Sequence, residues 1–341
     1  MRVTIRSTVL VVVSAVALAW WALHAVAQPV PQSFAAEIEH LSEAGGDFDT
    51  DNLISNEQSY LDVIPALKAA GVTGGAYVGV GPDQSFSYIA QVRPSIAFIV
   101  DIRRDNLLLH LLFKALFAAA ENRAEYLCLL TGRPVPEHVE TWASRSLEQI
   151  AAYLDEARPT PDAARGHRLD RTIASFGVPL TAADVSTIGR FHRTFIDAGL
   201  RLKFESRGRP PSPNYPTYRD LLFATDRTGR AWNYLTAEPD FQFVKSLEAR
   251  DLVVPVVGDL GGTHALSAIA ELMAARGERL SAFYISNVET YLYGDSYAQF
   301  VKNVTGLPRD QRSVIIRSTF RNSISASEVQ SANQFVSGGA R

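Results

Sequence analysis

The sequence predicts an α/β fold: an open, mostly parallel sheet with a large helical insertion between the second and third strands. Short, continuously apolar segments are each followed by a turn and a helical pattern, as in sheets that helices cover on both faces. This alternation stops at about residue 121 and resumes near residue 252. We therefore expect one α/β domain over 28–341, with an insertion at about 121–250.

The first 27 residues have the three parts of a secretory signal peptide. Arg2 and Arg6 precede an apolar run over 9–23, and Ala25-Val26-Ala27 follows as a small-residue cleavage pattern. Cleavage of 1–27 would leave an extracytoplasmic protein, either periplasmic or secreted. The alternative is an uncleaved N-terminal membrane anchor, because the run is nearly long enough to span a bilayer.

Glycine and proline positions delimit the first half of the expected sheet. Gly71 ends a helix, Asp83 is positioned to cap the next one, and Pro94 stops it. The expected elements are a helix over 55–70, a strand over 76–80, a helix over 84–91, a strand over 95–101 and a helix over 106–120.

The insertion has several helical patterns and ends in a proline-rich loop. Helices are expected over 136–157, 169–176 and 182–198, the last with Thr181 and Asp184 as a capping box. The stretch 207–216 has four prolines within seven residues and is predicted to be a surface loop.

Alternating elements return after the insertion. They are a strand over 252–257, a helix over 264–276, a strand over 280–285, a helix over 297–304, a strand over 313–317 and a last helix over 329–335.

Charge and cysteine content exclude several function classes. Without 1–27 the chain has 31 basic and 36 acidic side chains, a formal charge of −5, which does not suit binding to nucleic acid. Cys128 is the only cysteine, so no intrachain disulfide can form, and its apolar surroundings predict a buried, inert thiol. No metal site is evident, and there is no H-E-x-x-H pattern.

Polar residues and glycines follow four of the five expected strands. In open α/β sheets, ligands bind outside the carboxyl ends of the strands. A glycine turn lets a ligand approach the backbone, and an acid after the second strand can accept hydrogen bonds from ribose hydroxyls. The sequence therefore predicts a small-molecule nucleoside site formed by Gly79 and Gly81, Asp101, Gly258 and Asp259, and Asn287 with Glu289.

At these positions the chain resembles class I S-adenosylmethionine-dependent methyltransferases, which have a Rossmann-like sheet. The resemblance covers 74–117 and 252–318. It implies S-adenosylmethionine as cofactor and an acceptor that the sequence does not identify. By this resemblance, Gly79, Gly81 and Asp83 would line the methionine and ribose side of the cofactor, and Asp101 would bind the ribose. Asp259 would lie near the adenine amino group. Asn287 and Glu289 would face the methyl donor as the catalytic pair.

The chain departs from this family at three points. Tyr77 stands where the family usually has an acid, and Asp83 replaces its third glycine. Only about two dozen residues follow the fifth expected strand, which favours the absence of the family's usual last hairpin.

Two other functions remain open. The departures and the leader favour a non-catalytic extracytoplasmic binding or scaffold protein on a degenerate methyltransferase fold. A third possibility is an NAD-dependent oxidoreductase, but its fingerprint needs glycine where this chain has Gln84. A serine hydrolase is disfavoured because no G-x-S-x-G pattern occurs.

Several side chains have both a functional and a structural interpretation. His264 is either a base or a residue that opens a helix, and Glu289 is either a base or an acid at a helix start. Arg103-Arg104 is either an anion-binding site or a solvated helix start, and for this pair we favour the solvated helix start. The aromatic side chains that form either a lid over the crevice or an anchor for the proline-rich loop are Tyr215, Tyr218, Trp232 and Tyr234.

Overall fold

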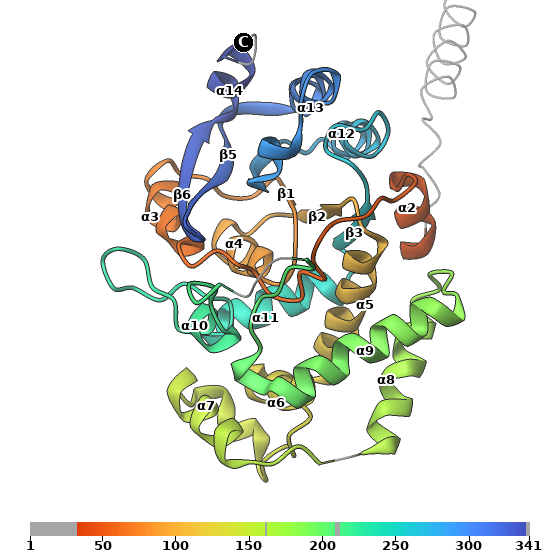
Figure 1. The fold of residues 1–341 in the computed structure, drawn as a ribbon, viewed down its shortest axis with the longest axis vertical. Coiled ribbons are helices and arrows are strands. Elements are labelled where there is room, and N and C mark those ends of the chain that lie inside the picture. Colours follow the sequence, from red (N-terminus) through yellow and green to blue (C-terminus); the bar gives the residue numbers. More distant parts are fainter. Residues whose placement is uncertain (1–32, 161, 209–211, 339–341) are drawn as a thin grey trace, which may run out of the picture. The chain divides into compact units, whose positions relative to one another are not determined.

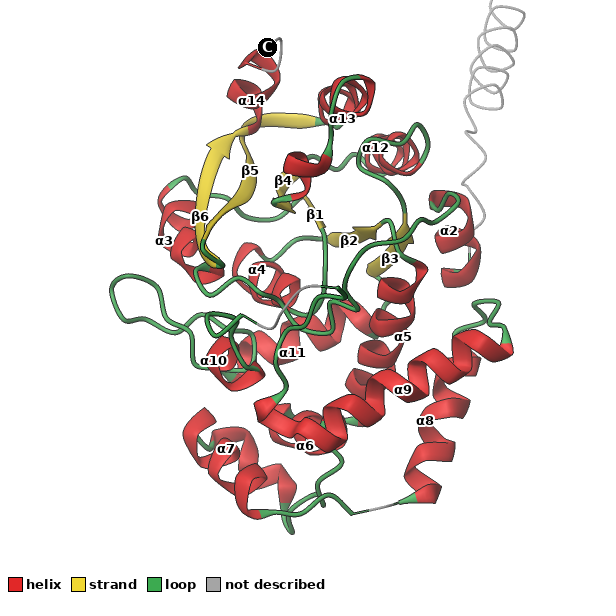
Figure 2. Cartoon of the chain, in the orientation of Figure 1, coloured by secondary structure: helices red, strands yellow, loops and turns green. Residues whose placement is uncertain are grey.

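A six-stranded sheet organises the chain (Figure 1, Figure 2). Its strands are β1 (Ala76–Gly79), β2 (Ile96–Asp101), β3 (Val253–Val257), β4 (Leu280–Ser286), β5 (Arg309–Arg321) and β6 (Ile324–Ser331). Their order is β3-β2-β1-β4-β5-β6. All neighbouring pairs are parallel except β5 and β6, which are antiparallel. The predicted α/β class with an open, mostly parallel sheet is therefore confirmed.

The structure is a computed structural model that describes residues 33–160, 162–208 and 212–338. The expected signal peptide lies outside the described residues. From Phe34 onward the chain forms one compact unit. Within the described ranges, no helix combines the length and the apolar character needed to cross a bilayer.

Helices precede, connect and follow the strands. The α-helices are α2 (Phe34–Leu41), α3 (Ile64–Ala69), α4 (Gln84–Val92), α5 (Arg104–Ala119), α6 (Arg123–Leu130), α7 (Leu147–Glu156), α8 (Ala163–Ser175), α9 (Ala182–Ala198), α10 (Tyr218–Leu222), α11 (Glu238–Glu248), α12 (Ala265–Ala275), α13 (Asp295–Gly306) and α14 (Ala332–Gly338). The 3₁₀ helices are η1 (Tyr60–Val63), η2 (Val139–Ser144), η3 (Gly199–Arg201) and η4 (Val288–Tyr291).

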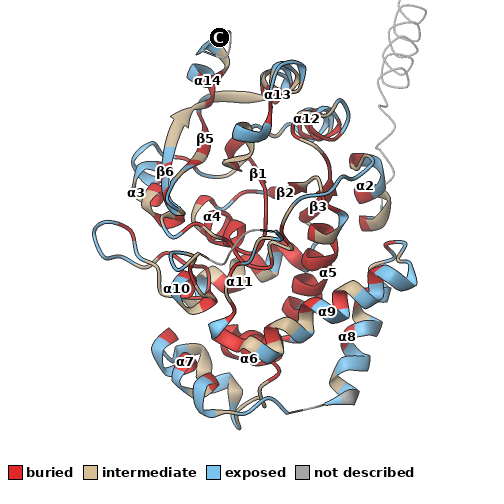
Figure 3. Ribbon diagram, in the orientation of Figure 1, coloured by how far each residue is buried: buried red, intermediate tan, exposed pale blue. Residues whose placement is uncertain are grey.

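Strands β1 to β4 are almost wholly buried because helices cover both faces of the sheet. Every residue of β1 and β3 is buried. Figure 3 shows this buried centre, and Figure 1 shows α4 and α5 on one side of the strands and α12 and α13 on the other. Continuous apolarity in 96–100 and 253–257 thus reflects strands that face a helix layer on each side. The helices α5 to α11 all lie between β2 and β3 in the chain.

The C-terminal hairpin corrects two expectations. The predicted helix over 329–335 begins as β6, and α14 starts only at Ala332. Because β5 and β6 form an antiparallel hairpin, the expected absence of a last hairpin is wrong. Asn322 and Ser323 both have positive φ (52° and 61°), as two-residue hairpin turns require. The strand escaped prediction because its buried positions carry serines rather than apolar residues.

Helix bounds differ from prediction where local capping decides. The predicted helix over 55–70 is a loop, then η1, then α3, since Pro65 suits only the first turn of a helix. The expected helix over 136–157 divides into η2 and α7, which starts at the capping box of Ser146. The predicted capping box of Thr181 and the bounds of α9 are confirmed.

Candidate functional site

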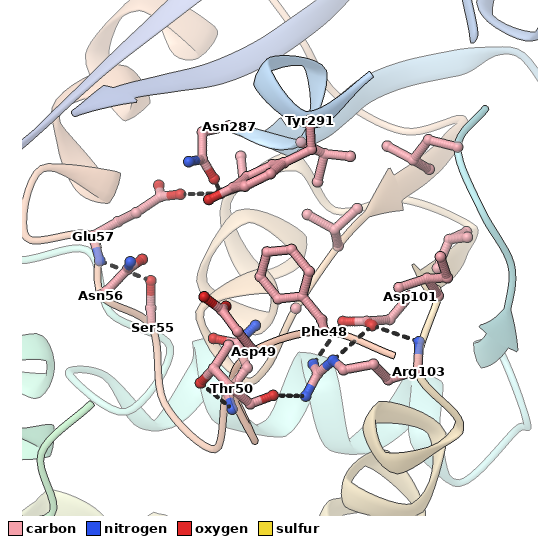
Figure 4. Close-up of a pocket in the computed structure, with 18 of the residues that line it drawn as sticks. Phe48, Asp49, Thr50, Ser55, Asn56, Glu57, Asp101, Arg103, Asn287 and Tyr291 are labelled. Carbon is pink, nitrogen blue, oxygen red and sulfur yellow. Dashed lines mark hydrogen bonds and ion pairs between the residues drawn. The ribbon is translucent and has the colours of Figure 1, made fainter. Parts of the chain in front are cut away.

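A pocket of about 260 Å³ lies at the carboxyl ends of strands β1 to β4 (Figure 4). Its lining includes Gly81 after β1, Asp101 at the end of β2, Asp259 after β3 and Asn287 after β4. The structure therefore brings together four of the residues that the sequence singled out. They meet because the carboxyl ends of parallel strands lie on one edge of the sheet.

The segment before η1 forms another wall of the pocket, which the sequence did not predict. The backbone N–H of Gly46 donates to the carbonyl of Ile102 at 2.8 Å. The carboxylate of Glu43 accepts the N–H groups of Asp259 (2.9 Å) and His264 (3.2 Å). This segment therefore packs across the strand ends, and the lining residues that it contributes are Phe48, Asp49, Thr50, Asn52, Ser55, Asn56 and Glu57.

Asp101 is paired with Arg103 inside the pocket wall. The backbone N–H and Nε of Arg103 donate to Oδ1 of Asp101 at 2.9 and 3.1 Å, and its Nη2 donates to Oδ2 at 2.9 Å. Nη1 of Arg103 donates to the carbonyls of Thr50 and Asp51 at 2.7 and 2.8 Å. The side chains of Arg103 and Asp101 are only 6% and 10% exposed, so the favoured prediction of a solvated arginine is wrong for Arg103. Arg104 is more exposed and pairs with Asp184 at 3.1 Å.

Asp83 follows the glycine turn in the chain, is buried, and is not among the residues that line the pocket. Its side chain does not cap α4, contrary to prediction. Instead Oδ2 accepts the hydroxyls of Tyr218 (2.9 Å) and Tyr234 (3.3 Å) in the core. Burial raises the pKa of the Asp83 carboxyl to about 6, although both tyrosine hydroxyls favour the charged form.

Two further candidates, Gly79 and Glu289, are also absent from the pocket lining. Gly79 is buried in β1, where a Cβ would collide with the ring of Tyr77, so its glycine serves packing. Glu289 lies on η4 and pairs with Arg317 at 3.4 Å. The structural interpretation therefore accounts for both residues.

Glu57 is one of the pocket residues that the sequence did not predict. It is 1% exposed and accepts hydrogen bonds from the hydroxyls of Ser286 and Ser318, the latter at 2.5 Å. Burial raises the pKa of its carboxyl, against hydrogen bonds from Ser286, Ser318 and Tyr284. A single Glu in a polar stretch gives no sequence signal. Figure 4 shows it beside Asn287, across the pocket from Asp101 and Arg103.

Ser286 and Gln84 add unusual backbone and side-chain features to the same wall. Ser286 has φ of 52°, a left-handed conformation that residues other than glycine, Asn and Asp seldom adopt. Nε2 of Gln84 donates to the hydroxyl of Tyr284 at 3.2 Å, and its Oε1 is buried with no hydrogen-bond partner in the structure. A ligand donor at this wall would satisfy that oxygen.

Aromatic side chains border the pocket. The rings of Phe48 and Tyr291 pack edge to face at 5.1 Å and are 37% and 44% exposed (Figure 4). Tyr215 also lines the pocket. Tyr218 and Tyr234 are core residues that hold Asp83, while Trp232 donates to Asp226 at 2.8 Å. These last three aromatics thus anchor the insertion rather than face a ligand.

The remaining candidates have structural surroundings. Nε2 of His264 lies 2.8 Å from the carbonyl of His40, and the residue opens α12 away from the pocket lining. Cys128 is buried, which raises the pKa of its thiol to about 12. In the part of the chain that the structure describes, no three His, Cys, Asp or Glu side chains are grouped so as to hold a metal ion.

Comparison with known proteins places this pocket within a family. A family model described as a domain of unknown function, DUF7790, matches residues 53–179 and 197–337. The chain belongs to this family. No curated protein matches it. The matched DUF7790 residues include Glu57, Gly81, Asp101, Asp259 and Asn287, whereas Phe48 and Thr50 lie before the first matched residue.

Proposed function

We propose that the pocket binds S-adenosylmethionine or a related nucleoside, and that the protein is a methyltransferase-like enzyme on a Rossmann-like sheet, with an acceptor still to be identified. The observation that carries this proposal is the convergence of Gly81, Asp101, Asp259 and Asn287 on one pocket. The strand order supports it, because β1 and β4 adjoin where the order reverses, and open α/β sheets bind ligands at that point.

The proposed ligand pose follows from the acceptors in the wall. A carboxylate offers about four lone-pair positions, and Arg103 uses three on Asp101, which leaves one for a ribose hydroxyl. Oδ1 of Asp259 accepts the N–H of Gly261 at 2.8 Å, which fixes this carboxylate for an adenine amino group at Oδ2. Gly81 has φ of 81° and no Cβ, so a ligand could approach its backbone closely.

Methyl transfer in this pocket would depend mainly on alignment of donor and acceptor. The resemblance assigns Asn287 and Glu289 to the methyl donor. Since Glu289 is paired with Arg317, we assign the donor side of the pocket to Asn287 alone.

A thermal-shift and calorimetric titration of the purified protein tests this proposal. S-adenosylmethionine and S-adenosylhomocysteine are the probes, and NAD is the comparison. A ligand at 100 times its Kd should add about 2.7 kcal/mol to the free energy of unfolding. We expect Asp101→Ala to abolish this shift and Asp105→Ala, a nearby acid outside the pocket lining, to preserve it. A folded protein that responds to none of these ligands would refute nucleoside binding, and a shift with NAD alone would favour the oxidoreductase.

A non-catalytic extracytoplasmic binding or scaffold role is the second candidate. The observation that favours it is that three acids assigned by resemblance, Asp83, Asp101 and Glu289, have protein partners. This role predicts no response to nucleosides and an exported chain. N-terminal sequencing of the protein recovered outside the cytoplasm should then begin at Gln28; a chain that begins at residue 1 in the membrane fraction would instead indicate a retained anchor.

A further inference from the structure

A chain of serine hydroxyls connects Glu57 with the protein surface. Oε2 of Glu57 accepts from Ser318 at 2.5 Å. The hydroxyl of Ser318 lies 3.1 Å from that of Ser327, which lies 3.1 Å from that of Ser59. Ser59 also lies 2.8 Å from the hydroxyl of Ser325. Each contact is within hydrogen-bonding distance, so the series is continuous.

The sheet register creates this series. Ser318 of β5 is paired with Ser327 of β6, and Ser325 lies two residues earlier on the same face of β6. Ser59 comes from the residue that precedes η1. Ser318, Ser325 and Ser327 are 3%, 7% and 8% exposed, whereas Ser59 is only partly buried.

Serines are unusual at these positions. A strand face that packs on the interior normally carries apolar residues, because a buried hydroxyl without a hydrogen bond destabilises the fold. Here the buried face of β6 carries hydroxyls that bond to one another and, through Ser318, to a carboxyl in the pocket. A serine hydroxyl both donates and accepts, so such a series can carry a proton in either direction.

Glu57 has the surroundings of a group that exchanges a proton. Among the described residues, no Lys, Arg or His forms an ion pair with it, and burial raises its pKa. The ionisable groups that its charge affects are the hydroxyls of Tyr77 on β1, Tyr88 on α4 and Tyr284 on β4. A carboxyl whose pKa is raised is a stronger base than an exposed glutamate, which suits it to general acid–base work.

We propose that Glu57 is the proton acceptor of this pocket and that Ser318, Ser327 and Ser59 transfer its proton to the surface. The identity of the methyl donor in this step rests on the function proposed above. The acceptor substrate would therefore carry an N–H or O–H group, and its nitrogen or oxygen would be aligned beside Glu57.

The proposed step balances in atoms and electrons. The acceptor's lone pair forms a bond to the methyl carbon, and the carbon–sulfur bond breaks with its electron pair going to sulfur, which becomes a neutral thioether. The acceptor's N–H or O–H proton passes to the Glu57 carboxylate. Glu57 then gives a proton to Ser318, and successive transfers through Ser327 and Ser59 release one to water.

Infrared spectroscopy of the purified full chain tests the relay without any methyl donor. The carbonyl band of the protonated Glu57 side chain is identified by its loss in Glu57→Gln. If that variant does not fold, Ser318→Ala gives the assignment, since it removes a hydrogen bond and shifts the band. A pH jump then measures how fast this carboxyl exchanges its proton with solvent.

Ser327→Ala breaks the series at its middle, and Ser281→Ala is the matched control. Both serines lie on strands and are similarly buried (8% and 7% exposed), but Ser281 donates to the carbonyl of Ala76. We expect proton exchange at Glu57 to slow at least about tenfold in Ser327→Ala, with an unchanged titration midpoint, and to be unaffected in Ser281→Ala. Unchanged exchange in Ser327→Ala, or a Glu57 carboxyl that titrates in the ordinary range of glutamate, would overturn the relay.

The two proposals fail separately. If S-adenosylmethionine does not bind but proton exchange at Glu57 slows in Ser327→Ala, the relay is supported and S-adenosylmethionine is refuted as the methyl donor. If S-adenosylmethionine binds but exchange in Ser327→Ala is unchanged, nucleoside binding is supported and the relay is refuted.

Discussion

Asp83 makes the stability of this fold depend on pH. Its carboxyl is buried against Tyr218 and Tyr234, and burial raises its pKa from 3.8 to about 6. The fold therefore favours the protonated form. The stability from this group is complete below pH 3.8 and is lost as the pH rises through about 6, which corresponds to about 3 kcal/mol of unfolding free energy.

Asp83→Asn removes this titration while it keeps an acceptor for one tyrosine hydroxyl. Part of the effect is already lost at pH 4, so we expect the variant to gain about 2 kcal/mol relative to the wild type between pH 4 and pH 8. Urea unfolding followed by tryptophan fluorescence at both pH values measures the difference, and Asp295→Asn at the exposed start of α13 is the control. The reasoning is refuted if the difference between Asp83→Asn and the wild type is the same at both pH values.

Three other substitutions test the pocket. Gly81→Val introduces a Cβ at φ of 81° and 3.1 Å from Nε2 of Gln84, so we expect a loss of roughly 1–2 kcal/mol in stability and weaker nucleoside binding by calorimetry; wild-type binding would contradict its place in the site. Arg103→Met leaves the Asp101 charge buried and unpaired, so the free energy of unfolding measured by urea denaturation should fall by about 3–5 kcal/mol. A loss below about 1 kcal/mol would show that the pair is well solvated. Phe48→Ala removes the edge-to-face contact with Tyr291, which is worth about 0.5–1.5 kcal/mol. Ligand dissociation measured by stopped flow should become up to about tenfold faster, with little change in the melting temperature. An unchanged dissociation rate would mean that this pair does not close the pocket.

The strands and the residues at their ends could be predicted because they depend on local pattern. Apolar runs such as 96–100 indicate buried parallel strands, and the carboxyl ends of parallel strands lie at the same edge of a sheet. The same rule predicts that Gly81, Asp101, Asp259 and Asn287 lie near one another, and all four line the pocket.

The partners of these residues depend on contacts far apart in the chain. Arg103 reads as a helix-start residue, yet its guanidinium is buried because the carbonyls of Thr50 and Asp51, about 50 residues earlier, fold over it. The position of Asp83 before a helix predicts a cap, but its carboxylate is buried and accepts the hydroxyl of Tyr218, which is 135 residues later in the chain. Local propensity contains no information about such pairings.

Glu57 shows the same limit for the candidate site. It contacts Ser286 and Ser318, which are 229 and 261 residues away. The serines that connect it with the surface also obscured β6, because a strand with hydroxyls on its buried face lacks the apolar alternation that marks a half-buried strand.

A crystal structure with S-adenosylhomocysteine tests the central claim, nucleoside binding at the four strand ends, most directly. The account predicts electron density for the adenosyl group in the pocket, with a ribose hydroxyl hydrogen-bonded to Asp101 and the adenine amino group to Asp259. An empty pocket in a protein saturated with this ligand, or density at another site, would contradict the claim.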